Sequence, residues 1–224
     1  GGSDVLLGGD VDETINDSVG NNHVDGGGGD DRWIASRNAD MTLSDGFLLI
    51  DTDVSTYLNV EDLRLIGGVG DNILDSSELT AASGVTLNLI SALPGDDIIR
   101  PSIDPAVALN LNGGGSIGTN NGFDTLDLSH FPATPNVIIN GPGTEDGNLG
   151  TVNAYSFNNI NDIILPPEYD FSAATFSAVE GDVTNTTSVV EVTRSVNTDI
   201  ASSVEVVLTG GTAVPGDDFT AGPV

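Results

Sequence analysis

A nine-residue repeat occupies the first three dozen residues of the chain and constrains the fold more than any other feature. In each copy a glycine-type position, an acidic or amide position and a large apolar position stand two residues apart. A short fixed period of this kind is typical of a solenoid in which every repeat contributes one short strand. The four copies are Gly2-Asp4-Leu6, Val11-Glu13-Ile15, Gly20-Asn22-Val24 and Gly29-Asp31-Trp33.

The residue types in this frame suit calcium loops. Glycine permits tight turns that direct carbonyl oxygens at one point, and a neighbouring acid adds negative charge. The apolar residue two places later is expected to begin a strand and to point inward. Zinc is disfavoured because the chain has no cysteine and its two histidines, His23 and His130, stand apart. The other interpretation of such Gly, Asp and Asn clusters is that they form ordinary turns.

The most complete copy, Gly26–Ile34, fits the nonapeptide GGxGxDxUx at every defined position. It resembles the repeats-in-toxin (RTX) family of secreted calcium-binding proteins. The resemblance implies a parallel β-roll with two nonapeptides in each turn, so that Glu13 stacks beneath Asp31 and Asp4 beneath Asn22. At a strand spacing of about 4.8 Å two such carboxylates repel by roughly 3 kcal/mol, and a cation between them removes this repulsion.

The predicted Ca²⁺ ligands of these loops are Asp4, Asp10, Asp12, Glu13, Asn22, Gly26, Gly28, Asp30 and Asp31. The copies are unequal, because Val11 stands at a glycine position and Asn22 carries no charge. Asp17 and Ser18 also replace the leading glycine pair of their copy. We therefore expect the sites to differ in strength.

The charge of the chain limits its partners. The formal net charge is -29 over 224 residues, and the five basic residues are all arginine. A nucleic-acid partner is excluded, since its phosphates would be repelled. An acid load of this size disfavours compaction unless counter-ions bind, and calcium is the expected counter-ion. Apolar residues make up 38% and aromatic residues 5% of the chain, which suits a thin solenoid with a core of small aliphatic side chains.

Weak calcium sites point to a compartment. Sites tuned to roughly 0.1–1 mM fill outside a cell and stay empty in the cytosol. We therefore expect a secreted or cell-surface, bacterial setting, with no membrane span, because no apolar run approaches the roughly 20 residues that a span needs. The chain begins with Gly-Gly-Ser-Asp, inside a repeat and without methionine, so it is expected to be an excerpt of a longer protein.

Residues 1–37 are the predicted β-roll, and the nine-residue spacing is lost after Ile34. Residues 35–58 are predicted to be irregular, with one short strand at Phe47–Ile50, and the region 38–165 is read as this connector followed by degenerate coils. Turn signals recur about every 25 residues. Alternating segments at 85–89, 107–111 and 137–140 lie between them, so residues 59–165 are predicted to form three or four parallel β-helix coils. An antiparallel barrel is the competing fold, but it would need two-residue Asn-Gly turns.

Four polar residues hold equivalent places in these coils: Asn72, Asp97, Asp124 and Asp162. The favoured interpretation is that their side chains cap the backbone of their own turns. The alternative is that Asn72, Asp97 and Asp124 are further calcium ligands. His130 is expected to be a solvated loop residue, and His23 to lie on an outward position.

The prolines Pro166 and Pro167 open a linker at 166–169, because adjacent prolines cannot join a central strand. Residues 170–224 are rich in Thr, Ser and Val and carry the segments Phe171–Asp182, Val190–Ser195 and Gly211–Phe219. They resemble the opening half of a Calx-beta domain, which implies a truncated immunoglobulin-like β-sandwich. The resemblance maps calcium ligands onto Glu180 and Asp218. These are weaker candidates, because Gly210 replaces an acid of the family pattern.

The sequence therefore predicts an all-β chain, in which a parallel β-roll and β-helix solenoid precedes a partial sandwich. The expected function is a non-enzymatic, calcium-stabilised structural or adhesive module of a large secreted or surface-anchored bacterial protein, with cell-surface or carbohydrate ligands as further partners. The alternative is a calcium-dependent lyase or epimerase acting on a polysaccharide. That chemistry needs a base and a cation beside the substrate carboxylate. Without lysine, the candidate cluster is Arg100 near Asp96 and Asp97.

Overall fold

The computed structural model describes residues 2–16, 19–114, 122–142, 148–153, 155–172 and 191–195. The chain divides into two compact units, Gly1–Pro166 and Pro167–Val224. Apart from one 3₁₀ turn, η1 (Ala81–Ser83), the regular structure of the described residues consists of strands. The all-β prediction is confirmed. Within the described ranges, no helix has the length and apolar character needed to cross a membrane.

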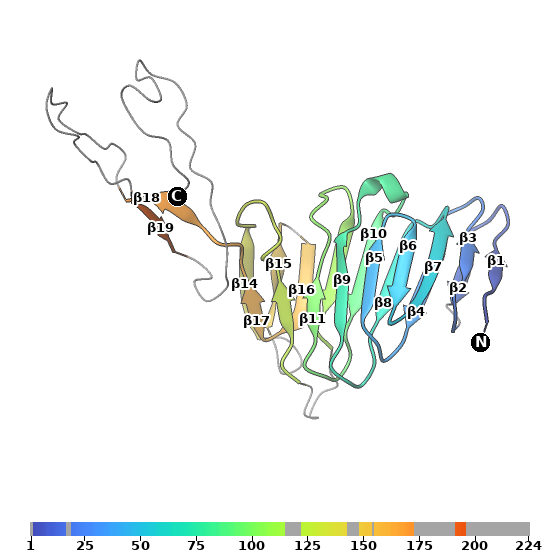
Figure 1. The fold of residues 1–224 in the computed structure, drawn as a ribbon, viewed down its shortest axis with the longest axis horizontal. Helices are drawn as coiled ribbons and strands as arrows, with labels where there is room; N and C mark the ends of the chain where they lie inside the picture. The colour runs from blue at the N-terminus through green and yellow to red at the C-terminus, as the bar shows by residue number, and fades with distance from the viewer. Residues whose placement is uncertain are drawn as a thin grey trace, which may run out of the picture. The chain divides into compact units, whose positions relative to one another are not determined.

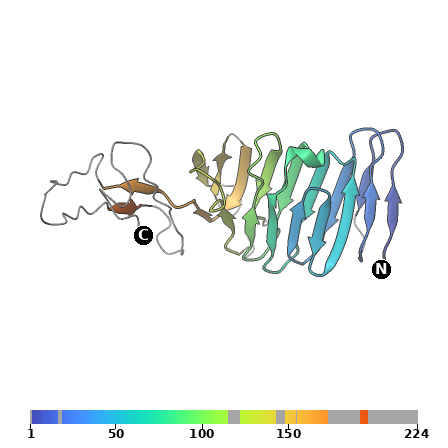
Figure 2. The same ribbon diagram turned by 45° about the horizontal axis from the view of Figure 1, so that its top comes forward.

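The first unit consists of two sheets that run along the roll from β1 to β17 (Figures 1 and 2). Sheet A contains, in order, β1 (Val5–Leu7), β3 (His23–Asp25), β7 (Asp53–Leu58), β6 (Phe47–Ile50), β5 (Met41–Ser44), β9 (Ile73–Glu78), β11 (Ile98–Arg100), β13 (Thr125–Asp127) and β17 (Asp162–Ile164). Sheet B contains β14 (Val137–Pro142), β15 (Asn148–Val152), β16 (Tyr155–Ile160), β12 (Ala108–Asn112), β10 (Leu87–Ser91), β8 (Asp62–Ile66), β4 (Arg32–Ser36) and β2 (Thr14–Asn16).

The nonapeptide period sets the register of the first coils. Strands alternate between the two sheets, and β1 pairs in parallel with β3 while β2 pairs in parallel with β4. Equivalent residues of neighbouring coils are 18 positions apart, which is two nonapeptides. The apolar residues of the repeat point between the sheets: Val24 and Trp33 are fully buried, and Trp33 packs on Tyr57 with ring centroids 5.8 Å apart.

An antiparallel meander interrupts sheet A where the sequence predicted an irregular stretch. Strands β5, β6 and β7 pair antiparallel, and β7 and β5 then join the parallel neighbours β3 and β9. The predicted strand at Phe47–Ile50 is confirmed as β6, but the expectation that the rest of residues 35–58 is irregular was wrong, because β5 and β7 flank this strand. The missed signal is Asp45-Gly46, a two-residue hairpin turn between Ser44 and Phe47 in which Gly46 has a φ of 77°.

The later coils are longer but remain parallel. Strands β8, β10 and β12 stack in sheet B, while β9, β11 and β13 stack in sheet A. The predicted strand at 137–140 lies in β14, which belongs to a second antiparallel meander, β14-β15-β16, rather than to a parallel coil. Strand β16 returns to the parallel stack beside β12, and β17 follows β13.

In the second unit the described residues form one antiparallel pair, β18 (Tyr169–Phe171) with β19 (Val192–Arg194). The two motifs that carry the Calx-beta resemblance most specifically, with Glu180 and Asp218, lie outside the described residues.

Candidate functional site

The loops of the roll gather at two corners. The A-to-B corner contains the loops 8–13, 26–31 and 59–61, through which the chain passes from sheet A to sheet B. The B-to-A corner contains 19–22, 37–40, 67–72, 92–97 and 122–124, through which the chain returns. The most complete nonapeptide loop, Gly26–Asp31, therefore lies at the A-to-B corner, whereas Asn72, Asp97 and Asp124 lie at the other corner with Asp4 and Asn22.

At the A-to-B corner the carboxylates of successive coils form a column. The backbone amide of Glu13 donates to Oδ1 of Asp31 at 2.8 Å, and the amide of Asp31 donates to Oε2 of Glu61 at 2.8 Å. Asp31 is fully buried, and its Oδ2 has no hydrogen-bond partner. The pairing of Glu13 with Asp31 thus brings together two residues that the sequence proposed as ligands, and it leaves one buried carboxylate oxygen for a further partner.

Position 26 has no room for a side chain, which explains the glycine there. A Cβ at Gly26 would lie 1.9 Å from the carbonyl oxygen of Asn59 and 2.7 Å from Oδ2 of Asp31. Gly8 makes the equivalent approach to Glu13, with Oε2 at 2.8 Å from a Cβ position. Two other glycines of the same loop, Gly27 and Gly29, have positive φ angles of 91° and 128°. The corner carboxylates therefore pack directly against glycine Cα atoms.

The other predicted ligands of this corner are exposed. Asp12 accepts the amide of Asp30 at 3.0 Å, and Asp10 lies 3.9 Å from a Cβ position on Gly28. Asp25, which was not predicted, accepts the Gly27 amide at 3.1 Å and the side-chain amide of Asn59 at 2.8 Å. Within the described ranges no three acidic or histidine side chains converge as a metal site.

The donor set at this corner fits calcium rather than a transition metal. Calcium takes six to eight oxygen ligands and accepts backbone carbonyls and water among them. Asp31 supplies a buried, unpartnered carboxylate oxygen, Glu13 supplies a second carboxylate, and the glycine loops supply carbonyl groups. Since few side chains converge, much of the coordination would come from carbonyl oxygens and water.

The B-to-A corner contains a second column built by the same rule. The amides of Asn72, Asp97 and Asp124 donate to the side-chain oxygens of Asp97, Asp124 and Asn161 at 2.7, 3.1 and 2.8 Å. Asn72 also accepts the Gly68 amide of its own turn at 2.8 Å. The predicted capping role therefore holds for Asn72, but Asp97 and Asp124 cap the backbone of the preceding coil.

Two details of this corner differ from the sequence prediction. Asn161 completes the column, whereas Asp162 is an exposed residue of β17 that accepts the Ile163 amide at 2.9 Å. The register of β17 with β13 is offset by one residue from the one expected, because Thr125 pairs with Asp162. At the start of the same corner the amide of Asp4 donates to Oδ1 of Asn22 at 3.1 Å.

Outside this buried column, two exposed aspartates, Asp71 and Asp96, accept backbone amides in the opposite direction along the roll. The amide of Asp96 donates to Asp71 at 3.0 Å, and the amide of Phe123 donates to Asp96 at 2.8 Å. Here each side chain accepts from the following coil, whereas in the buried column each accepts from the preceding one. Asp71 and Asp96 therefore hold two negative charges beside the buried column.

Burial and these charges alter the ionisation of the second column. Burial raises the pKa of Asp97 to about 7, with further contributions from Asp71 and Asp96. Burial raises the pKa of Asp124 to about 8, and the charges of Asp97 and Asp96 act in the same direction. Oδ2 of Asp97 is buried and has no hydrogen-bond partner. At pH 7 Asp124 is therefore mostly protonated, and Asp97 is about half protonated, so the column carries less than its full negative charge.

The candidate catalytic cluster is not assembled. Arg100 pairs with Asp127 at 2.9 Å and with Asp75 at 3.6 Å, across three adjacent strands of sheet A, and not with Asp96 or Asp97. His23 faces outward as expected and bonds Thr56 at 2.7 Å. The expectation for His130 was wrong: the ring is half-buried, and its Nε2 bonds the carbonyl oxygen of Pro101 at 2.8 Å.

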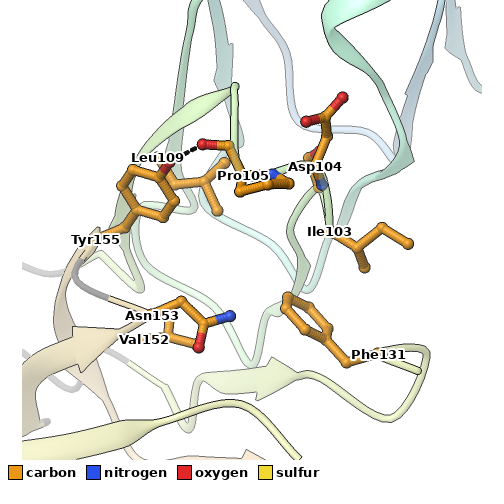
Figure 3. A pocket seen from close by; sticks show the side chains of 9 residues that line it. Ile103, Asp104, Pro105, Leu109, Phe131, Val152, Asn153 and Tyr155 are labelled. Carbon is orange, nitrogen blue, oxygen red and sulfur yellow. Dashed lines mark hydrogen bonds between the residues drawn. The ribbon is translucent and has the colours of Figure 1, made fainter. Parts of the chain in front are cut away.

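Figure 3 shows a pocket between the 101–107 turn and the start of β16. The Tyr155 hydroxyl donates to the Pro105 carbonyl, and Asp104 accepts the Ala81 and Ala106 amides, which lower the pKa of Asp104. The volume of this pocket is about 60 Å³, whereas ligand pockets measure roughly 300–1,000 Å³. The two corners, not this pocket, are therefore the strongest candidates for binding.

No protein-family model matches this chain, and no curated protein matches it.

Proposed function

We propose that residues 1–37 form a calcium-binding β-roll of the RTX type. We further propose that the chain is a calcium-stabilised structural or adhesive module of a large secreted or cell-surface bacterial protein. The observation that carries this proposal is the buried Oδ2 of Asp31, which has no partner and lies at the corner where Glu13 stacks on the same column.

The physical argument is one of compensation. A buried carboxylate oxygen without a hydrogen-bond partner is destabilising, and a cation bound to it would remove this cost. Asp31 and Glu13 would hold the ion together with carbonyl groups of the glycine loops, including Gly26 and Gly28. Asp10, Asp12 and Asp30 are exposed residues of the same loops, and their negative charges would attract the calcium ion. Bound calcium would supply positive charge between coils whose carboxylates otherwise repel.

The pair Asp4 and Asn22, at the other corner, is the weaker candidate, because Asn22 is neutral and its Oδ1 is engaged by the Asp4 amide. For residues 170–224 we keep the proposal of a truncated Calx-beta-like sandwich, with Glu180 and Asp218 as its acids. The net charge of -29 supports a calcium-rich, extracellular setting, because a chain with so many acids gains most from divalent counter-ions.

Trp33 provides the test, because it is the single tryptophan of the chain, is fully buried, and follows the Gly26–Asp31 loop in β4. Calcium should change Trp33 fluorescence and raise the melting temperature. With site constants near 0.1–1 mM, millimolar calcium adds roughly 0.4–1.4 kcal/mol for each site. Magnesium should substitute poorly, because it demands tighter octahedral geometry.

Asp31→Asn preserves the shape of the side chain and removes its charge, so it should abolish most of this response. Asp71→Asn is the matched control, since Asp71 is an exposed amide acceptor at the other corner. Fluorescence and melting curves that do not change between calcium and a chelator would contradict the proposal.

A further inference from the structure

The outer faces of the two sheets differ in charge. The chain has 34 acidic residues, yet the strands of sheet B contain one acid, Asp62, together with two of the five arginines, Arg32 and Arg64. Their formal charge is therefore 2 - 1 = +1. The strands of sheet A contain one arginine and six acids, a formal charge of 1 - 6 = -5. The sheet A acids are Asp25, Asp53, Asp75, Glu78, Asp127 and Asp162.

The two arginines of sheet B are held side by side. Oδ2 of Asp62 accepts Nε of Arg32 at 2.6 Å and Nη2 of Arg64 at 2.8 Å, and the parallel register places Arg32 directly beside Asp62. Burial opposes the ionisation of Asp62, but hydrogen bonds from Arg64 and Arg32 outweigh it and lower its pKa. The carboxylate therefore stays charged and keeps both guanidinium groups in place.

The arginine pair still has hydrogen-bond donors that a ligand can use. The Arg32 side chain is 40% exposed, and within the described residues its two terminal nitrogens make no hydrogen bond. One carboxylate neutralises one of the two guanidinium charges, so the pair keeps a net positive charge. Guanidinium groups recognise carboxylates through paired hydrogen bonds of matching geometry.

The neighbouring side chains form a regular row across the outer face of sheet B. In register, the row contains Asn16, Ile34, Arg64, Leu89, Asn110 and Ser156. Adjacent members are about 4.8 Å apart, the spacing of paired strands. Amide and hydroxyl groups that both donate and accept stand at the ends of the row, and aliphatic groups flank the arginine.

We propose that the outer face of sheet B binds a uronate-containing polysaccharide. The Arg32–Arg64 pair takes a sugar carboxylate, Asn16 and Asn110 take ring hydroxyls, and Ile34 and Leu89 pack against the C–H faces of the rings. This inference gives the adhesive role a ligand class and rests on that role, but it uses none of the residues of the calcium loops.

An acidic peptide fits this face less well. Peptides are usually recognised at an open strand edge or in a groove. The strands β4, β8 and β10 are paired on both sides, so their backbone groups are already used in the ladder. Binding on this face must therefore come from side chains, which suits a ligand that is rich in hydroxyl groups and carboxylates.

The experiment is calorimetric titration of the calcium-saturated chain with an oligogalacturonate short enough to stay soluble with calcium. A neutral oligogalactan is the matched ligand without carboxylates. We expect binding of the charged ligand alone, weakening as salt is added. Arg32→Gln should lose about tenfold in affinity. Asp62→Asn should bind more tightly, because it raises the net charge of the pair, and Arg100→Gln on sheet A should leave affinity unchanged.

Asn110→Asp is a second test that leaves the arginine pair intact, and its added carboxylate should weaken binding. Unchanged affinity in Arg32→Gln and Asn110→Asp, or equal binding of the neutral oligogalactan, would overturn the inference. Poly-glutamate that bound as tightly as the oligogalacturonate would assign the face to acidic peptides instead. Calcium-dependent Trp33 fluorescence, recorded on the same samples, separates a failure of this inference from a failure of the calcium proposal.

Discussion

The two corners of the roll use one hydrogen-bonding rule and yet differ in how they accommodate buried acids. At both, a backbone amide donates to a side-chain oxygen of the following coil, as in Glu13 to Asp31 and Asn72 to Asp97. At the B-to-A corner, burial raises the pKa of Asp97 and Asp124 to about 7 and about 8, so protons neutralise the column. At the A-to-B corner we propose that calcium does so. The comparison teaches that the same hydrogen-bonded ladder of aspartates can be built at both corners, and under our proposal the surroundings of each ladder decide whether protons or calcium neutralise it.

Glycine substitution should give the largest effect, and it tests whether the two corners are packed alike. A Cβ at Gly26 would lie 1.9 Å from the Asn59 carbonyl oxygen, and one at Gly113 would lie 2.0 Å from that of Asn159. Since both atoms belong to backbone, Gly26→Ala and Gly113→Ala should each cost about 3 kcal/mol in the free energy of unfolding. Urea denaturation followed by circular dichroism measures this.

Gly84→Ala is the control for these variants. Gly84 has a φ of 88° with nothing within 4 Å of a Cβ position, so its cost should be limited to backbone strain of about 1 kcal/mol. If Gly26→Ala and Gly113→Ala were no more damaging than Gly84→Ala, the close packing at the corners would not govern stability.

A pH series should separate the corners next. An acid whose pKa is raised in the folded state is stabilising while protonated, and this contribution is lost as pH rises. The window runs from the unfolded value near 4 to about 7 for Asp97 and about 8 for Asp124. Stability in saturating calcium should therefore fall between about pH 4 and pH 8.

Asp97→Asn keeps the oxygen that accepts the Asn72 amide and removes the titrating proton, so it should flatten this profile. At pH 8 the variant should be more stable than the parent chain by roughly 2–4 kcal/mol, since each unit of the raised pKa is worth about 1.4 kcal/mol. Asn is compatible with the column, since Asn72 and Asn161 already occupy it. A parent chain whose urea midpoint did not change over this range would refute proton neutralisation of the column.

Calcium affinity gives a third contrast. Asp31→Ala should reduce affinity by about tenfold or more, because it removes the buried carboxylate, whereas Asn72→Ala and Asp162→Ala should change it little. Calorimetric titration of the three variants with calcium compares them directly. Equal losses in all three would mean that both corners hold metal.

The smallest expected effect concerns a strained residue. Leu93 has a φ of 70°, at a loop position where Gly27 and Gly114 have values of 91° and 112°. Leu93→Gly relieves a cost of about 1–2 kcal/mol, partly offset by the greater freedom of glycine in the unfolded chain. We expect a net gain of about 0.5 kcal/mol in thermal unfolding, and a loss of stability would show that the packing of the Leu93 side chain outweighs its strain.

Local periodicity was sufficient to predict the first coils. The nine-residue frame predicted inward Val24 and Trp33, and the resemblance to the RTX repeat implied the stacking of Glu13 beneath Asp31, which the parallel register of β2 with β4 contains. In the later coils, turn chemistry predicted that Asn72 would cap its own turn, which is a contact within five residues of chain.

Tertiary structure decided the strand pairings, side-chain partners and pKa values that the nine-residue repeat could not predict. The meander β5-β6-β7 depends on pairing with β3 and β9. Asn161, and not Asp162, accepts the Asp124 amide in the buried column, because the register of β17 pairs Asp162 with Thr125 of β13. The partners of Arg100 and the raised pKa of Asp97 likewise come from neighbouring coils about 25 residues away. Sequence by itself thus determined which residues could turn, alternate and carry charge. Burial and strand register, which exist only when distant segments meet, determined which of those acids are protonated, which pair with an arginine, and which has a buried oxygen left for the proposed calcium ion.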